Sequence, residues 1–121
     1  MPNSTQIDRT SIDSSLQRLE QRHRTLLTEL ADIGLVLRGS IVRRLTRCAN
    51  PTCRCKANPP TLHGPYYQWT RKVAGKTVTV RLSAEQAARC SEWIRNMRKL
   101  DRIVTQLQGI GLRAAALVCK S

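Results

Sequence analysis

The sequence of 121 residues predicts an α+β fold, in which a small antiparallel sheet of two or three strands is flanked by two long helices. Three observations lead to this prediction. Near both ends of the chain, apolar residues recur at alternating spacings of three and four, the pattern of helices that pack against other helices. Between them the apolar spacing changes to two, as in the strands of a half-buried sheet. The middle also holds three of the five cysteines within a basic stretch.

The first helix is predicted over residues 15–37, about 33 Å at 1.5 Å per residue. Ser14-Ser-Leu-Gln17 has the form of a capping box at its start. No usable period precedes it, so residues 1–13 are predicted to be disordered. His23 is interpreted as a polar residue tolerated in a helix interface rather than as a ligand. The predicted seam is Leu16, Leu19, His23, Leu26, Leu30, Ile33 and Leu37.

The second helix is predicted over residues 84–108. Ser83-Ala-Glu-Gln86 is a second capping box, and Gly109 and Gly111 are expected to end the helix, which leaves a short segment over residues 109–121. The two seams predict an antiparallel coiled-coil hairpin or a dimer between two chains, and residues 14–121 are predicted to form a single domain. The second stripe is Cys90, Trp93, Met97, Leu100, Val104 and Leu107, widened by Ile94 and Ile103.

Strands are predicted over residues 40–46, 66–73 and 76–82, with a turn at Ala74-Gly75 between the last two. If the register of this hairpin matches, its apolar face is Tyr67, Trp69, Val73, Val78, Val80 and Leu82. The opposite face is polar, basic and rich in hydroxyls, and comprises Gln68, Thr70, Lys72, Thr77, Thr79 and Arg81. A two-stranded hairpin alone is marginally stable, so the helices are expected to cover the apolar face.

A cluster of possible metal ligands lies between the first two predicted strands. Zinc takes four sulfur or nitrogen ligands arranged tetrahedrally, and three cysteines with one histidine are a common structural set. The prolines of this segment exclude a helix, and it has too few apolar residues to order itself by burial. The sequence therefore predicts a structural zinc knuckle whose ligands are Cys48, Cys53, Cys55 and His63.

Three alternatives remain open for this cluster. Cys90 or water replaces His63 as the fourth ligand, or the three cysteines are reduced thiols without a metal. No Asp or Glu lies near the cluster to act as a general base, so a structural role is favoured over a catalytic one and no enzymatic activity is expected. Cys90 is expected in the core and Cys119 in a loose tail.

The formal charge of +13 is concentrated in the middle of the chain. Ten Lys and Arg residues lie between Ile33 and Ala84, with no Asp or Glu among them. Unopposed charge of this kind favours a nucleic acid over an anionic protein partner or a membrane surface. Phosphate contacts are expected from Arg43, Arg44, Arg47, Arg54, Lys56 and Arg71. Groove contacts are expected from Gln68, Thr70, Lys72, Lys76, Thr77, Thr79 and Arg81, as in β-ribbon readers.

The expected location is the cytoplasm. The start of the chain lacks the pattern of a secretory signal, and no apolar stretch approaches the roughly 20 residues that span a membrane. An odd number of cysteines cannot pair completely, which fits reduced thiols.

The chain resembles a family of small uncharacterised bacterial proteins often found among mobile-element and transposase-associated genes. The resemblance covers roughly residues 37 to 107, and it implies a bacterial or phage source, a link to DNA transactions and no established activity. The predicted strands also resemble, in pattern only, the DNA-binding sheets at the ends of some tyrosine recombinases. The family resemblance is carried by Leu37-Arg-Gly-Ser, Thr46-Arg-Cys48, Cys53-Arg-Cys55, His63-Gly-Pro-Tyr-Tyr-Gln-Trp-Thr-Arg-Lys, Gly75-Lys-Thr-Val-Thr and Leu82-Ser-Ala-Glu-Gln.

The first functional hypothesis is a zinc-stabilised, non-enzymatic nucleic-acid-binding protein, with duplex DNA bound through the basic hairpin in mobile-element transactions. One alternative is a helical adaptor whose seams bind a transposase, a recombinase or another large machine. Another is an RNA-binding component of a ribonucleoprotein, in which Tyr66, Tyr67 and Trp69 stack on bases.

Overall fold

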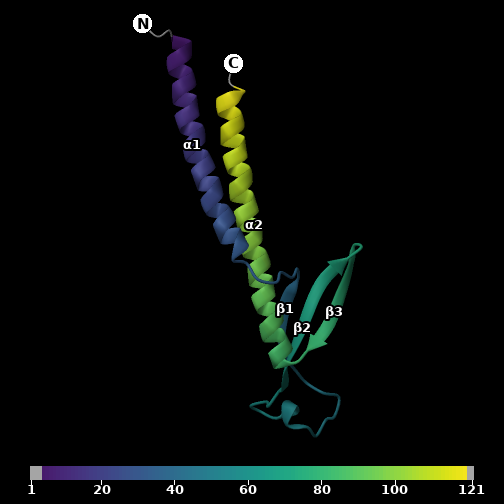
Figure 1. Ribbon diagram of the computed structural model, residues 1–121. Helices are drawn as coiled ribbons and strands as arrows, with labels where there is room; N and C mark the ends of the chain where they lie inside the picture. The colour runs from purple at the N-terminus through teal and green to yellow at the C-terminus, as the bar shows by residue number, and fades with distance from the viewer. Residues whose placement is uncertain (1–3, 120–121) are drawn as a thin grey trace. The chain divides into compact units, whose positions relative to one another are not determined.

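The computed structural model describes residues 4–119, with side chains from Thr10 onward. It confirms the α+β class and a three-stranded antiparallel sheet. The chain divides into two compact units: a helical unit up to Gly34 and from Arg98, and a sheet unit, Leu35–Met97. In chain order (Figure 1) the elements are α1 (Ser4–Ala31), β1 (Ser40–Thr46), the 3₁₀ turn η1 (Arg54–Lys56), β2 (His63–Val73), β3 (Lys76–Leu82) and α2 (Ala84–Val118).

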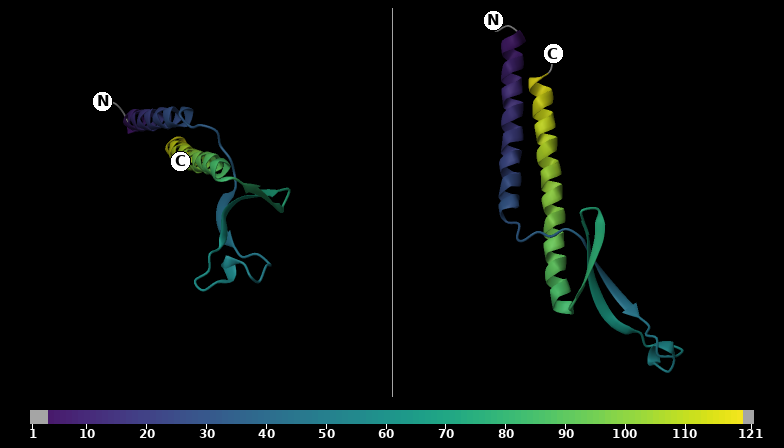
Figure 2. Two further views of the ribbon diagram at one scale, coloured as in Figure 1. Left: turned by 90° about the horizontal axis from the view of Figure 1, so that it is seen from below. Right: turned by 90° about the vertical axis from the view of Figure 1, so that its right-hand side faces the viewer.

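In the helical unit, α1 and the C-terminal half of α2 lie side by side (Figures 1 and 2). Burial of their apolar side chains supplies the main stabilisation that such a helix pair gains. The centre of this core is a buried cluster of Leu26, Ile103 and Ile110. Partly buried Leu19, Leu30, Ile33 and Leu107 pack against it.

Helix α1 begins earlier than the sequence analysis predicts. Its first residue, Ser4, lies within the segment 1–13 that was expected to be disordered, and residues 1–3 lie outside the described part of the chain. Ile12 is half-buried and stands four residues before Leu16, so the apolar seam extends upstream of the supposed capping box. Ser14, the proposed cap, is an exposed residue inside the helix.

The same helix also ends earlier, at Ala31 instead of Leu37. The N–H of Ile33 donates to the carbonyl of Leu30 over 3.2 Å, which tightens the last turn, and Gly34 follows. Earlier in α1, His23 lies on the predicted seam but is exposed.

Helix α2 continues to Val118, past the two glycines that were predicted to end it. A helical glycine is about 1 kcal/mol less favourable than alanine. Between Gly109 and Gly111, however, Ile110 is only 8% exposed in the core of the helical unit. Burial of this side chain and of half-buried Leu117 outweighs the glycine penalty, so the helix propagates.

The apolar stripe predicted for α2 is wrong at Val104, which is exposed. Ile103 is 2% exposed, whereas its neighbour Val104 is 41% exposed. The buried face of the second half therefore runs through Leu100, Ile103, Leu107, Ile110, Ala114 and Leu117. None of the helices in the described part of the chain is long and apolar enough to cross a bilayer.

The strands form in the order β1-β2-β3, and the bounds of β1 and β3 match the prediction. β2 begins at His63 rather than Tyr66, because its pairing with β1 continues to Thr46 past an irregularity after Arg44. The turn between β2 and β3 has φ values of 50° at Ala74 and 79° at Gly75. Two positive values are the signature of a type I′ turn, which matches the twist of the flanking strands.

The register confirms the two predicted faces of the hairpin. Trp69 pairs with Val80 and Thr70 with Thr79, so the apolar and polar sets alternate across the strands. The apolar face is not fully covered, since Val73 and Val80 are 46% and 39% exposed.

Short connections complete the sheet unit. The N–H of Leu37 donates to the carbonyl of Trp93 over 3.1 Å, which ties the segment before β1 to the first half of α2. The capping box at the start of α2 is confirmed: the N–H of Ser83 donates to Oε1 of Gln86 over 2.9 Å, and the N–H of Gln86 donates to Oγ of Ser83 over 3.1 Å.

Candidate metal centre and basic sheet face

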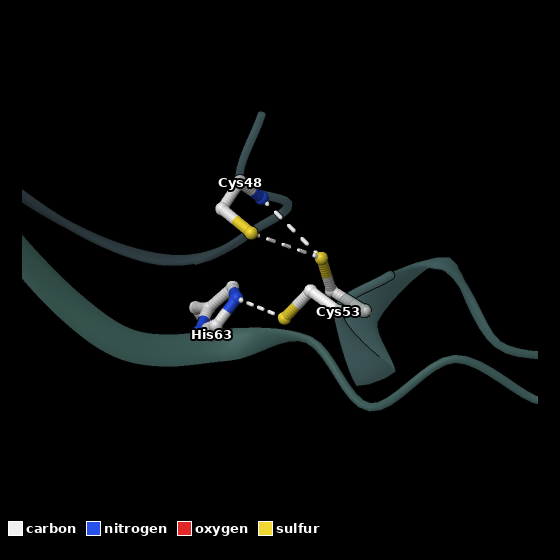
Figure 3. Close-up of side chains that lie close together, drawn as sticks. Cys48, Cys53 and His63 are labelled. Carbon is white, nitrogen blue, oxygen red and sulfur yellow. Dashed lines mark hydrogen bonds between the residues drawn. The ribbon is translucent and has the colours of Figure 1, made fainter. Parts of the chain in front are cut away.

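The four predicted metal ligands come together in the structure. Figure 3 shows Cys48, Cys53 and His63 of this set. Cys48 follows β1, Cys53 precedes η1, Cys55 lies within η1, and His63 opens β2. Their ligand atoms all lie within 4.8 Å of one another. The cluster contains His63 and does not contain Cys90.

The distances within the cluster suit one tetrahedral ion. With metal–sulfur bonds of 2.3 Å, two sulfurs on a tetrahedron are separated by about 3.8 Å. The Sγ atoms of Cys48 and Cys55 are 3.7 Å apart. Sγ of Cys53 and Nε2 of His63 are 3.1 Å apart, somewhat closer than the roughly 3.6 Å edge expected for a sulfur and a nitrogen. The residues present therefore fit a metal of tetrahedral preference.

Local turns position the thiols. Oδ1 of Asn50 accepts from the N–H of Thr52 over 3.1 Å and from its hydroxyl over 2.9 Å, an Asx turn. The N–H of Cys53 then donates to the carbonyl of Asn50 over 3.2 Å, and that of Lys56 to the carbonyl of Cys53 over 2.9 Å. These bonds fold the segment back so that its cysteines face one another.

The knuckle, residues 48–63, has almost no core of its own. Cys55, at 0% exposure, is its one buried residue, and the others are half-buried or exposed. Hydrophobic burial within the knuckle therefore contributes little to its order. A bound metal that cross-links four positions would supply that order.

The thiols differ in acidity. Burial opposes ionisation of Cys55, but hydrogen bonds from the N–H of Cys48, at 3.3 Å, and from neighbouring thiols and His63 lower its pKa to about 6. A backbone hydrogen bond at Asn50 favours the Cys48 thiolate, but the thiols of Cys53 and Cys55, together with burial, raise the pKa of Cys48. The lowered pKa of Cys55 favours its thiolate, the form that binds metals.

Most predicted nucleic-acid contacts fall on the polar face of the sheet. Nζ of Lys72 donates to the hydroxyl of Thr77 over 2.7 Å, and the hydroxyls of Thr70 and Thr79 are 3.3 Å apart. The register places on this one face Arg44, Gln68, Thr70, Lys72, Thr77, Thr79 and Arg81.

Tyr66 shares this face and was not predicted as part of it. The guanidinium of Arg81 lies 3.8 Å from the centre of the Tyr66 ring, a cation–π contact that holds the arginine over the sheet. The period of two in the sequence could have placed Tyr66 on this face, because it alternates with Gln68 and Thr70.

The structure separates the remaining predicted contacts from this face. Arg43, Arg71 and Lys76 belong to the opposite face by register, and Arg71 stacks on Trp69 with its guanidinium carbon 4.0 Å from the ring centre. Arg47, Arg54 and Lys56 are exposed in or next to the knuckle. Lys56 is partly engaged there, since its Nζ donates to the carbonyl of Cys48.

Comparison with known proteins identifies a family but no activity. No curated protein and no solved structure matches the chain. Residues 16–95 match a family described as a domain of unknown function, DUF6788, and this region contains the whole sheet and the knuckle. Because the match covers more than half of the 121 residues, the chain belongs to the DUF6788 family.

Proposed function

We propose that this protein is a non-enzymatic, zinc-stabilised nucleic-acid-binding protein that holds duplex DNA against the polar face of its sheet. The observation that carries the proposal is the register, which aligns basic and hydroxyl side chains on one surface. Such a surface offers donors both to phosphates and to base edges.

The charge of the sheet unit supports this proposal. Between Ile33 and Ala84 no carboxylate is available to neutralise the ten basic residues. The cations of the polar face are therefore not consumed by ion pairs within this segment, and phosphates are the counterions that a duplex provides. We infer a DNA transaction of a mobile element from the family resemblance of the sequence, and a cytoplasmic location from its odd number of cysteines.

Zinc is the metal proposed for the knuckle. Cysteine thiolates and one imidazole at tetrahedral spacing form the ligand set typical of structural zinc. In this role the four ligands hold the knuckle, and with it exposed Arg47 and Arg54, in a fixed position beside the sheet. Metal analysis of protein purified without chelator is expected to give about one zinc per chain, and well under half an equivalent would contradict this assignment.

The binding proposal is tested by fluorescence anisotropy with a labelled short duplex. Affinity should fall steeply with salt, because each neutralised phosphate releases counterions. Lys72→Glu and Arg81→Glu should each weaken binding by at least about tenfold at low salt. Arg95→Glu, at an exposed position of α2, is the matched control and should weaken binding less. If Arg95→Glu abolishes binding and the sheet variants do not, the binding surface lies on α2. The affinity for a single-stranded RNA of equal length, measured in the same assay, shows whether the protein prefers RNA or DNA.

A helical adaptor is the second candidate function. Large apolar side chains on the helical unit are exposed: Leu112 is 73% exposed and Val118 is 64% exposed. Such residues commonly mark an interface with a partner or with a second copy of the chain. Light scattering after size exclusion, with and without duplex, distinguishes a dimer from a monomer. A monomer that is indifferent to the duplex would favour the adaptor.

A further inference from the structure

A cavity of about 450 Å³ opens in the sheet unit where β1 begins beside β2. Pairing between these strands stops at Ser40 and Thr70, whereas β2 and β3 stay paired to the hairpin turn. The sheet therefore has a step at this point, and side chains from both of its faces can reach the cavity. The lining residues are Arg38, Gly39, Ser40, Thr70, Arg71, Lys72 and Thr77. Three of them are basic, three carry hydroxyls and none is acidic.

Arg71 is held at this cavity by an aromatic support. Its guanidinium stacks on Trp69, and the indole Nε1 of Trp69 donates to the carbonyl of Arg38 over 3.0 Å. Nη1 of Arg71 is buried, yet it has no hydrogen-bond partner within residues 4–119. A buried donor of this kind is unfavourable unless an acceptor reaches it. An anionic ligand in the cavity would supply that acceptor once the guanidinium turns toward it.

Other residues that line the cavity are also held in place. Lys72 is oriented by its hydrogen bond to Thr77. The backbone of Gly39 has a φ of 124° and lies so close to Trp69 and to the carbonyl of Thr70 that no side chain would fit there. Gly39 therefore lines the cavity with backbone alone, and cationic groups lie on either side of β2.

We propose that this cavity binds the terminal phosphate of a nucleic-acid strand. A phosphomonoester carries about −1.5 to −2 charges and three strong acceptor oxygens. A phosphodiester inside a strand carries one charge and is linked on two sides. The lining holds three cations, Arg38, Arg71 and Lys72, together with three hydroxyl side chains and no acidic residue, and this composition matches the more highly charged group. The inference deepens the proposed function and rests on it, because the phosphate is that of a bound nucleic acid.

The test uses the full chain and two duplexes of identical sequence, one with phosphorylated ends and one with hydroxyl ends. Fluorescence anisotropy is expected to show roughly tenfold tighter binding of the phosphorylated duplex. Arg71→Gln and Lys72→Gln should each reduce this preference to about twofold or less. Arg95→Gln removes the same charge from exposed α2 and should retain the preference. Circular dichroism of each variant verifies folding, and Lys72→Gln keeps the test valid if Arg71→Gln does not fold.

A second measurement does not depend on duplex binding. Because Arg71 stacks on Trp69, inorganic phosphate should change the tryptophan fluorescence more than chloride does at equal ionic strength, and Arg71→Gln should abolish this difference. Equal affinity for both duplexes in the parent protein would overturn the terminal-phosphate inference and leave the proposed function standing. A fluorescence response without any duplex binding would overturn both and identify a site for free phosphate.

Discussion

Removal of the metal by a chelator should open the knuckle and leave the helical unit intact. Residues 48–63 contain one buried side chain, Cys55, and the only regular structure between β1 and β2 is the three-residue turn η1. No hydrophobic core remains to hold this segment once the cross-link is lost. The helical unit has its own core of Leu26, Ile103 and Ile110 and does not include the metal ligands.

The magnitude follows from linkage between binding and folding. When free metal exceeds its dissociation constant 100-fold, binding stabilises the closed knuckle by about 2.7 kcal/mol. That free energy corresponds to about a 100-fold lower population of the open form. Where opening and closing are fast compared with cleavage, the rate of proteolysis follows this population. Chelation should therefore accelerate cleavage within the knuckle by about two orders of magnitude.

Limited trypsin digestion measures this effect, because Arg47, Arg54 and Lys56 are exposed substrates in or beside the knuckle. Mass spectrometry assigns each cut. Cleavage after Arg24 in α1 is the internal control and should not change with chelator.

Two variants complete the experiment. Cys53→Ser removes a ligand and should be cleaved rapidly even with metal present. Cys119→Ser changes an exposed thiol outside the cluster and should behave like the parent protein. The metal-based account would be refuted by equal cleavage rates with and without chelator. Equal sensitivity of the two variants would show that the wrong cysteines are assigned as ligands.

Three further substitutions test the packing. Ile103→Ala should destabilise the helical unit by about 2–5 kcal/mol, whereas Val104→Ala should cost less than about 1 kcal/mol because this valine is 41% exposed. Urea denaturation followed by circular dichroism compares the two variants, and equal losses of stability would contradict the burial pattern. Gly39→Ala should lower the melting temperature, since its Cβ would collide with Trp69, and an unchanged melting temperature would contradict this geometry. Gly109→Ala should stabilise α2 by about 0.5–1 kcal/mol, because nothing lies within 4 Å of the added Cβ; a loss of stability would argue against a helix through this position.

The strands were more predictable than the helix ends. Alternating side chains and the Ala74-Gly75 turn are local signals, and they define β1 and β3 correctly. The bounds of α1 and α2 depend on which apolar residues find a partner. Local breakers such as Gly109 misled the prediction because burial of Ile110 outweighs them.

The candidate metal-ligand cluster was predictable because few residue types bind metals and these four are close in sequence. The cavity at the start of β1 was not, because it requires the register. Only the pairing of Ser40 with Thr70 shows that Arg71 lies beyond the end of β1. Stacking of Arg71 on Trp69, two residues away on the same face, then follows from the period of two.

The sheet unit has two candidate phosphate-binding regions, the cavity and the basic residues in or next to the knuckle. They lie at opposite ends of β1. Ser40 lines the cavity, and Thr46 at the other end pairs with the candidate metal ligand His63. Seven strand residues separate these ends by about 20 Å, at 3.4 Å per residue. A metal bound there would constrain the knuckle end directly, whereas the cavity is built by contacts among Trp69, Arg71 and their neighbours. A duplex that reaches both regions should lose affinity on chelation, because the basic residues of the knuckle are no longer fixed, but it should keep its preference for a phosphorylated end. Loss of that preference on chelation would show that the cavity depends on the metal and would contradict this separation of roles.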